Sequence, residues 1–194
     1  FADAGGAIFC QAGSPNFEDC LFDRNFARGS VARGGAVFAT SYGTPRFEDC
    51  VFRNNEASVF EGGADAAGGA IHGDRTDLDL IRCDFSNNAV WLRSGSAFGT
   101  GGAVHFAGGR LGASECSFEE NIARMGGGIH LTITETCAGP APTVATVGDC
   151  RFRFNQSDRG SGVTINRNED DDGFPESCND LHDIDVVIQN CVVE

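Results

Sequence analysis

Apolar residues recur along the chain in two short runs per repeat, and polar or glycine-rich segments separate these runs. Residues 5–25, GGAIFCQAGSPNFEDCLFDRN, and residues 34–55, GGAVFATSYGTPRFEDCVFRNN, are two copies of one pattern. Each copy begins with Gly-Gly and an aliphatic residue and ends with Cys-x-Phe-x-x-Asn. No segment shows the sustained 3.6-residue spacing of apolar positions that is typical of an amphipathic helix. The pattern therefore predicts short strands joined by turns.

The same pattern continues over the rest of the chain. Two further copies, at 68–88 and 101–121, are clean, and a fifth copy at 126–155 contains an insertion. The sixth copy is degenerate, beginning at GSGVTI and ending with QNCVVE. Without insertions the unit is about 25 residues long, a length typical of solenoid repeats. Leucine is too scarce for leucine-rich repeats, so we expect an all-β, single-stranded parallel β-helix of about six coils.

Alignment of the copies produces columns of identical residues. Residues two apart share one face of a strand, so the Cys and Phe of Cys-x-Phe should point into the solenoid together. The Asn suits a tight corner, because Asn tolerates left-handed backbone and its amide can bridge successive turns. The paired glycines suit the opposite corner. The columns are Cys20, Cys50, Cys83, Cys116, Cys150 and Cys191; Phe22, Phe52, Phe85, Phe118 and Phe152; and Asn25, Asn55, Asn88, Asn121 and Asn155.

The repeats cover nearly all of residues 1–194, which we interpret as a single β-helix segment. Insertions interrupt it at about 132–146 and 166–184. The chain opens without Met, and both ends cut through the repeat pattern, so we expect a fragment of a longer protein. Unpaired strand edges attract further strands, so further coils or subunits of a larger assembly should continue the stack at both ends.

The combination of Gly-Gly-Ala-Ile/Val with Phe-x-x-Asn resembles the repeat of the polymorphic outer membrane proteins, which are surface-displayed autotransporter passengers. Four clean copies carry both motifs in a fixed order, and two looser copies extend the similarity over nearly the whole chain. The resemblance implies a right-handed parallel β-helix, displayed outside the cell, that serves adhesion or surface structure.

The charge of the chain excludes two classes of partner. Fourteen basic residues, all of them Arg, stand against 28 acidic residues and give a net charge of −14. Such an acidic chain is unsuited to the phosphate backbone of nucleic acid or to an anionic membrane surface. No apolar run approaches the length of a membrane-spanning helix. We therefore expect no nucleic-acid partner and no direct insertion into a membrane.

The nine cysteines need two explanations. Neighbours in the inward column should lie about 4.8 Å apart along the axis, but straight stacking leaves their Cβ atoms farther apart than a disulfide prefers. We favour a buried thiol ladder; the alternative pairs Cys20–Cys50, Cys83–Cys116 and Cys150–Cys191. Cys137 and Cys178 lie at equivalent points of the two insertions, and we expect a disulfide between them in an oxidising compartment.

Histidines and carboxylates provide weak candidates for metal sites. His72, His105 and His130 follow one another in an outward column, where they could chelate a transition metal or sense pH; we favour an exposed polar ladder. Carboxylates that could hold Ca²⁺ lack the order of known calcium loops, so we favour solvated acidic surface and expect no cofactor. They cluster at Glu18, Asp19, Glu48 and Asp49, and at Asp170, Asp171 and Asp172.

The uniform columns favour a non-catalytic structural or adhesive segment. It would act as a rigid rod within an extracellular or cell-surface protein or filament and could meet a host or glycan receptor. The alternative is a polysaccharide lyase or hydrolase, or a glycan-binding β-helix, since fold alone does not decide function. An enzyme would place its site beside the insertions, near Glu135, Asp170, Asp171, Asp172, Glu176 and His182. The chain has no Lys, however, and most of its Arg residues are scattered or paired in the columns, so we expect no catalysis.

Overall fold

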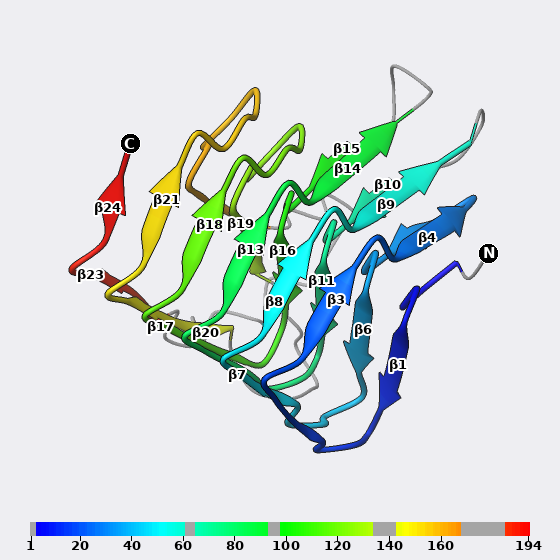
Figure 1. Cartoon of the computed structure of the whole chain (residues 1–194), viewed down its shortest axis with the longest axis horizontal. Coiled ribbons are helices and arrows are strands. Elements are labelled where there is room, and N and C mark those ends of the chain that lie inside the picture. The colour runs from blue at the N-terminus through cyan, green and yellow to red at the C-terminus, as the bar shows by residue number, and fades with distance from the viewer. Residues whose placement is uncertain (1–2, 61–64, 93–97, 134–142, 168–184) are drawn as a thin grey trace, which may run out of the picture.

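The chain forms an all-β solenoid in which parallel strands stack along one axis (Figure 1). The computed structural model describes residues 3–60, 65–92, 98–133, 143–167 and 185–194. None of these residues lies in a helix, and so no helix able to cross a membrane occurs among them. The prediction of an all-β parallel β-helix is confirmed.

Three six-stranded sheets form the body of the solenoid, and each repeat contributes one strand to each sheet. Sheet I contains the strands that follow Gly-Gly: β1 (Ile8–Gln11), β6 (Val37–Thr40), β11 (Ile71–Asp74), β16 (Val104–Ala107), β19 (Ile129–Ile133) and β22 (Val163–Arg167). Sheet II contains β2 (Asn16–Glu18), β7 (Arg46–Glu48), β12 (Leu78–Ile81), β17 (Arg110–Ser114), β20 (Val144–Gly148) and β23 (Asp185–Gln189). Sheet III contains the Cys-x-Phe strands: β3 (Leu21–Asp23), β8 (Val51–Arg53), β13 (Asp84–Ser86), β18 (Ser117–Glu119), β21 (Arg151–Arg153) and β24 (Val192–Val193).

The solenoid amounts to about four turns rather than the six coils that six copies of the repeat suggested. The fifth and sixth copies are interrupted by residues 134–142 and 168–184, which lie outside the described residues. The sixth copy contributes β22, β23 and β24. Counting copies of the motif therefore overestimated the number of turns.

The main core lies between sheets I, II and III. Its largest feature is a single stack of the five Cys-x-Phe rings, whose neighbouring centroids are 4.5 to 4.8 Å apart and whose planes differ by no more than 6°. All five rings are buried. A second stack, formed by Phe17 and Phe47 of sheet II at 4.9 Å, meets the first edge-on. Identical side chains stack because each strand pairs in register with the equivalent strand of the next repeat.

The corners of each coil depend on residues in the left-handed region. The residue before each column cysteine has φ between 49° and 55°, and the residue before each column asparagine has φ between 51° and 57°. The Asn itself is not the left-handed residue, which corrects one expectation. The first glycine of each Gly-Gly has φ between 60° and 68°. The second glycine is required for close approach, because a Cβ on Gly35 would lie 2.0 Å from the carbonyl oxygen of Gly69.

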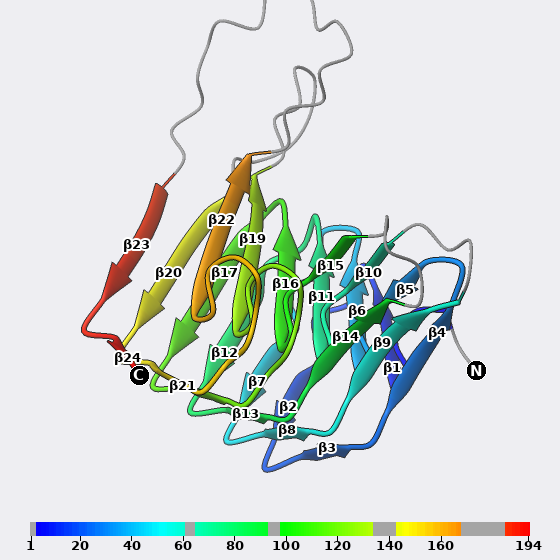
Figure 2. The ribbon, with the colours of Figure 1, turned by 90° about the horizontal axis from the view of Figure 1, so that it is seen from above.

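A feature that the sequence did not predict is an arm that projects from the first three repeats (Figures 1 and 2). Two three-stranded parallel sheets form it. Sheet IV contains β4 (Phe26–Gly29), β9 (Glu56–Val59) and β14 (Ala89–Leu92), and sheet V contains β5 (Ala32–Arg33), β10 (Asp65–Ala67) and β15 (Phe98–Thr100). The arm has a small core of its own, separate from the main core: Ala27, Ala32, Ala57, Val59, Ala66, Val90 and Ala123.

Candidate functional site

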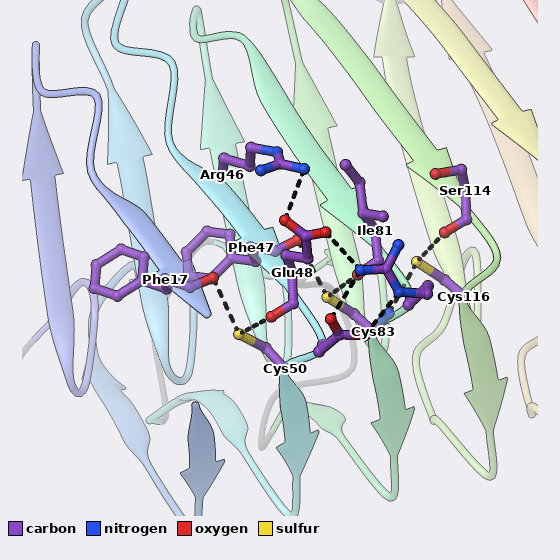
Figure 3. A network of polar contacts seen from close by, with 11 residues as sticks. Phe17, Arg46, Phe47, Glu48, Cys50, Ile81, Cys83, Ser114 and Cys116 are labelled. Atoms are coloured by element: carbon purple, nitrogen blue, oxygen red, sulfur yellow. Dashed lines mark hydrogen bonds and ion pairs between the residues drawn. The ribbon is translucent and has the colours of Figure 1, made fainter. Parts of the chain in front are cut away.

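The column cysteines form a ladder of free thiols at the corner between sheets II and III (Figure 3). Cys50 Sγ donates to the carbonyl of Glu48 at 3.2 Å and lies 3.5 Å from the carbonyl of Phe17 on the preceding coil. Cys83 Sγ repeats this arrangement with Ile81 and Phe47, both at 3.4 Å. The alternative disulfide pairs between neighbouring coils are not formed in the structure. Cys137 and Cys178 lie outside the described residues, so their disulfide stays a prediction.

The ladder has the properties of structural rather than reactive cysteines. Burial raises the pKa of the Cys50 thiol to about 11 and also raises the pKa of the Cys191 thiol, whereas side-chain hydrogen bonds with Cys116 lower the pKa of the buried Cys83 and Cys150 thiols. A reactive cysteine needs a lowered pKa and an electropositive, partly exposed environment. Cys50 is fully buried, as is Cys83. The thiols therefore act as small apolar groups that also satisfy backbone carbonyls.

The acidic cluster at the same corner is neutralised by arginines. Arg82 binds Asp49 through two hydrogen bonds of 2.8 Å and also contacts Glu48. Arg46 pairs with the other carboxylate oxygen of Glu48 at 2.8 Å (Figure 3). Hydrogen bonds from Arg82 lower the pKa of Asp49. Carboxylates held in this way are poor candidates for Ca²⁺, because the arginines occupy the oxygens that a cation would need.

Glu18 and Asp19 are the remaining carboxylate candidates that the described part of the chain contains. Glu18 and Asp19 occupy the equivalent corner of the first repeat, with Asp19 in the left-handed turn position. Among the described residues, no three His, Cys, Asp or Glu side chains are grouped so that they could hold a metal ion. Asp170, Asp171 and Asp172 lie outside the described residues, as do the proposed enzyme-site residues Glu135, Glu176 and His182.

The three column histidines are buried, so the expectation of an exposed polar ladder is wrong. His72, His105 and His130 are 6%, 9% and 1% exposed although they project from the outer face of sheet I. The rings of His72 and His105 stack at 4.7 Å with planes 9° apart, and those of His105 and His130 lie 5.3 Å apart. The face-to-face rings of His72 and His105 direct their nitrogens outward from the stack instead of toward one shared point, and the ring of His130 is tilted by 38° against that of His105. This geometry does not fit a common metal ion.

Burial keeps these imidazoles neutral. Desolvation lowers the pKa of His72 to about 3, with a smaller contribution from the nearby Arg33, and lowers the pKa of His130 to about 4. The pKa of His105 is also lowered by desolvation and by its two histidine neighbours. Such shifts are expected when a base is removed from water without an anionic partner.

The asparagine column links successive coils by side-chain hydrogen bonds. Asn88 Nδ2 donates to Asn121 Oδ1 at 3.0 Å and to the carbonyl of Phe52 at 2.9 Å. Asn88 Oδ1 accepts from the backbone N–H and the side-chain amide of Asn55, at 3.1 and 2.9 Å. The same arrangement recurs at Asn55 and Asn121, and Asn155 accepts from Asn121 and donates to the carbonyl of Phe118. The ladder thus satisfies buried backbone groups at every coil.

No protein family, curated protein or solved structure matches this chain in the comparisons made. The similarity to polymorphic outer membrane protein repeats consequently stays a prediction that rests on the two motifs.

Proposed function

We propose that the chain is a non-catalytic structural or adhesive segment of an extracellular or cell-surface protein, in which it serves as a rigid β-helical rod. The observation that carries this proposal is that its polar and reactive side chains are engaged from coil to coil. Contacts of each of these three kinds join neighbouring repeats, namely Cys50 with Phe17, Asn55 with Asn88, and Arg82 with Asp49. A catalytic site needs polar groups directed at a substrate, and the side chains of these ladders are directed at one another.

The finer features of the proposed rod follow from general rules. Connections between parallel strands of one sheet are right-handed in about 98% of cases, so we infer a right-handed, single-stranded helix. Apolar side chains are exposed on the edge strands at both ends of the stack, including Phe9, Leu21 and Val193. We infer that further coils or subunits of a larger filament or surface protein cover these edges. In this proposal the polymorphic outer membrane protein type of repeat accounts for the six motif copies.

The absence of catalysis is tested with polysaccharides. The chain is incubated with a panel of neutral and acidic polysaccharides, and new reducing ends and unsaturated products are measured. We expect no turnover above that of a heat-denatured sample. Sustained, enzyme-dependent release of either product would overturn the proposal in favour of a lyase or hydrolase.

The inferred continuation of the stack is tested by molecular mass in solution. Residues 1–194 are expected to associate with increasing concentration. A stable monomer at high concentration, with amides of the end strands protected from exchange, would show that the edges need no partner.

A glycan-binding role is the second candidate, and the exposed Trp91 on the outer face of the arm favours it. Trp91 is 49% exposed and lies in register with Ser58 and Arg28 on the neighbouring strands. Exposed aromatic rings next to polar groups are suited to the apolar faces of sugars. A glycan array with the wild-type chain and Trp91→Ala tests this candidate. Binding that Trp91→Ala removes would favour it, and an array without hits would refute it.

A further inference from the structure

One column of side chains closes the corner between the arm and the body of the solenoid. The side chains of this corner column project from the outer face of sheet I. Three of them extend back over the Gly-Gly turn and contact the residue five positions earlier in the chain. The ring of His72 donates to the carbonyl of Ala67, and a 2.6 Å hydrogen bond joins His105 Nδ1 to Thr100 Oγ1. Thr164 Oγ1 reaches the carbonyl of Arg159 at 2.9 Å in the same way. The column contains Phe9, Phe38, His72, His105, His130 and Thr164.

The three histidines fit this corner only as neutral rings. All three are buried, the rings of His72 and His105 are stacked, and the ring of His130 is tilted by 38° against that of His105. Nδ1 of His72 and Nδ1 of His130 have no hydrogen-bond partner in their buried positions. A neutral imidazole has one N–H donor, whereas a protonated imidazole has two. Protonation of His72 or His130 would therefore add a buried donor at a position that offers it no acceptor. Protonation of neighbouring rings would also place like charges about 5 Å apart, where they repel strongly in a low-dielectric environment.

The surrounding charges increase this penalty. From sheet V, the Arg33 guanidinium lies 6.0 Å from the centre of the Phe38 ring, and its charge opposes protonation of His72 and His105. The carboxylate of Asp74, on the same face of sheet I, is engaged by Thr40 and Arg75. Asp65 lies at the exposed end of β10, two residues before Ala67.

The other neighbours of the rings are uncharged or lie at the end of the column. From β15 and β19 the neighbours of His105 are the hydroxyl groups of Thr100 and Thr132. Arg159 adds a second cation at the far end of the column. Within the described residues, none of the three rings forms an ion pair with a carboxylate.

The fold allows the corner to open without unfolding the body. The arm core and the main core are separate clusters, and the arm joins sheet I only through the Gly-Gly corners. Gly68 and Gly101 there have φ of 68° and 67°, so each corner is a backbone turn with no side chain of its own. His72 and His105 supply side-chain connections between sheet I and sheet V, at Ala67 of β10 and Thr100 of β15.

We propose that His72, His105 and His130 form an acid-sensitive clamp that holds the arm against sheet I at neutral pH and releases it when the medium becomes acidic. In the open state the rings reach water and bind protons. Each ring that binds a proton only in the open state raises the opening equilibrium constant about tenfold per pH unit below its ordinary titration range. The role goes beyond that of a rigid rod, because it makes one part of the rod responsive to its surroundings.

The single tryptophan of the chain reports directly on the arm, because Trp91 lies on β14. Trp91 emission and backbone amide exchange are measured from about pH 7 to about pH 4, the range that includes ordinary imidazole titration. We expect an emission change together with faster exchange at Ala67 and Thr100, while the amides of β13 and β18 remain protected. Simultaneous loss of protection in the arm and in these core strands would be global unfolding and would overturn the proposal.

Matched variants separate the histidines from carboxylates, which also titrate toward pH 4. The triple variant His72→Phe, His105→Phe, His130→Phe uses the residue that the column already has at Phe38, and it should abolish the transition. His130→Thr uses the residue found at Thr164 and should move the midpoint to lower pH. His182→Asn, at the fourth histidine of the chain, should leave the transition unchanged.

Three results would contradict the clamp. The transition could persist in the triple variant, or His182→Asn could remove it. If the triple variant does not fold, an NMR titration of the wild-type imidazoles decides the question: rings that titrate near pH 6.5 with no change at Trp91 would overturn the proposal. Rings that stay neutral until the arm opens would support it.

Discussion

Replacement of Asn88 by Ala should be among the most destabilising single changes in the chain. Asn88 is fully buried, and its side-chain amide makes four hydrogen bonds to three different residues. The substitution leaves the carbonyl of Phe52 and the backbone N–H of Asn55 buried without these partners. The side-chain amides of Asn55 and Asn121 also lose a partner, although their other hydrogen bonds remain.

The expected loss in the free energy of unfolding follows from the number of polar groups that lose a hydrogen-bond partner. A buried polar group left without a partner costs about 1–3 kcal/mol. Asn88→Ala leaves two backbone groups without this partner and removes one hydrogen bond from each of two side-chain amides. With allowance for local relaxation, the expected loss of stability is about 3–5 kcal/mol. A domain of ordinary stability has about 5–15 kcal/mol in total, so the variant should unfold at a much lower urea concentration.

The neighbouring residue supplies a matched control. Asn87 is exposed and has φ of 54°, so it occupies the left-handed turn position without joining the ladder. Asn87→Gly should change the free energy of unfolding by no more than about 0.5 kcal/mol, since Gly adopts this backbone freely. Urea denaturation followed by circular dichroism measures both variants. If Asn88→Ala and Asn87→Gly lose similar amounts, the asparagine ladder does not stabilise the stack and the reasoning is wrong.

Three further predictions use other parts of the molecule. Phe85→Ala should cost about 3–5 kcal/mol by leaving a cavity in the ring stack, whereas Phe154→Ala, at a ring 55% exposed, should cost far less; equal losses in urea denaturation would contradict this. Cys137 and Cys178 should be recovered as one disulfide-linked peptide pair after non-reducing digestion of an oxidised preparation, and free thiols there would refute the bridge. The free energy of unfolding should fall as pH decreases below about 6.5 for as long as the arm stays closed, because the unfolded chain then binds protons that the buried rings refuse, with the pKa of His72 lowered to about 3. The slope is about 1.4 kcal/mol per pH unit for each such ring, and a stability profile unchanged between pH 7 and 5 in chemical denaturation would be inconsistent with it.

The repeated columns were predictable because their physical cause is local and periodic. A Phe two residues after a Cys must share its strand face, and parallel pairing in register then places Phe85 between Phe52 and Phe118. Beyond the number of copies of the motif, this prediction needs no knowledge of which distant parts of the chain are in contact. The number of turns was less accessible, since insertions separate the strands of the last two copies and the last copy is degenerate.

The arm could not be predicted from the pattern of the chain. Its strands contain residues such as Ala27, Ala57 and Ala66, and alanine has a low preference for strands and only a small apolar surface. The segments therefore resemble loops between Asn and Gly-Gly. The burial of His72 was missed for the same reason, because the outer face of sheet I is exposed in a simple solenoid and is covered here by the corner that leads to the arm.

The contrast between constant and varying columns indicates where this solenoid does more than hold itself together. The Phe and Asn columns keep one residue type over five repeats, since each coil packs the same face against its neighbour. The corner column has the same backbone geometry throughout, yet it changes from Phe38 to three histidines and then to Thr164. Packing alone would be served at least as well by Phe, which buries more apolar surface and never binds a proton. Three consecutive titratable rings in a buried corner cost stability under acidic conditions, and a clamp that must open in acid is a function for which that cost is useful.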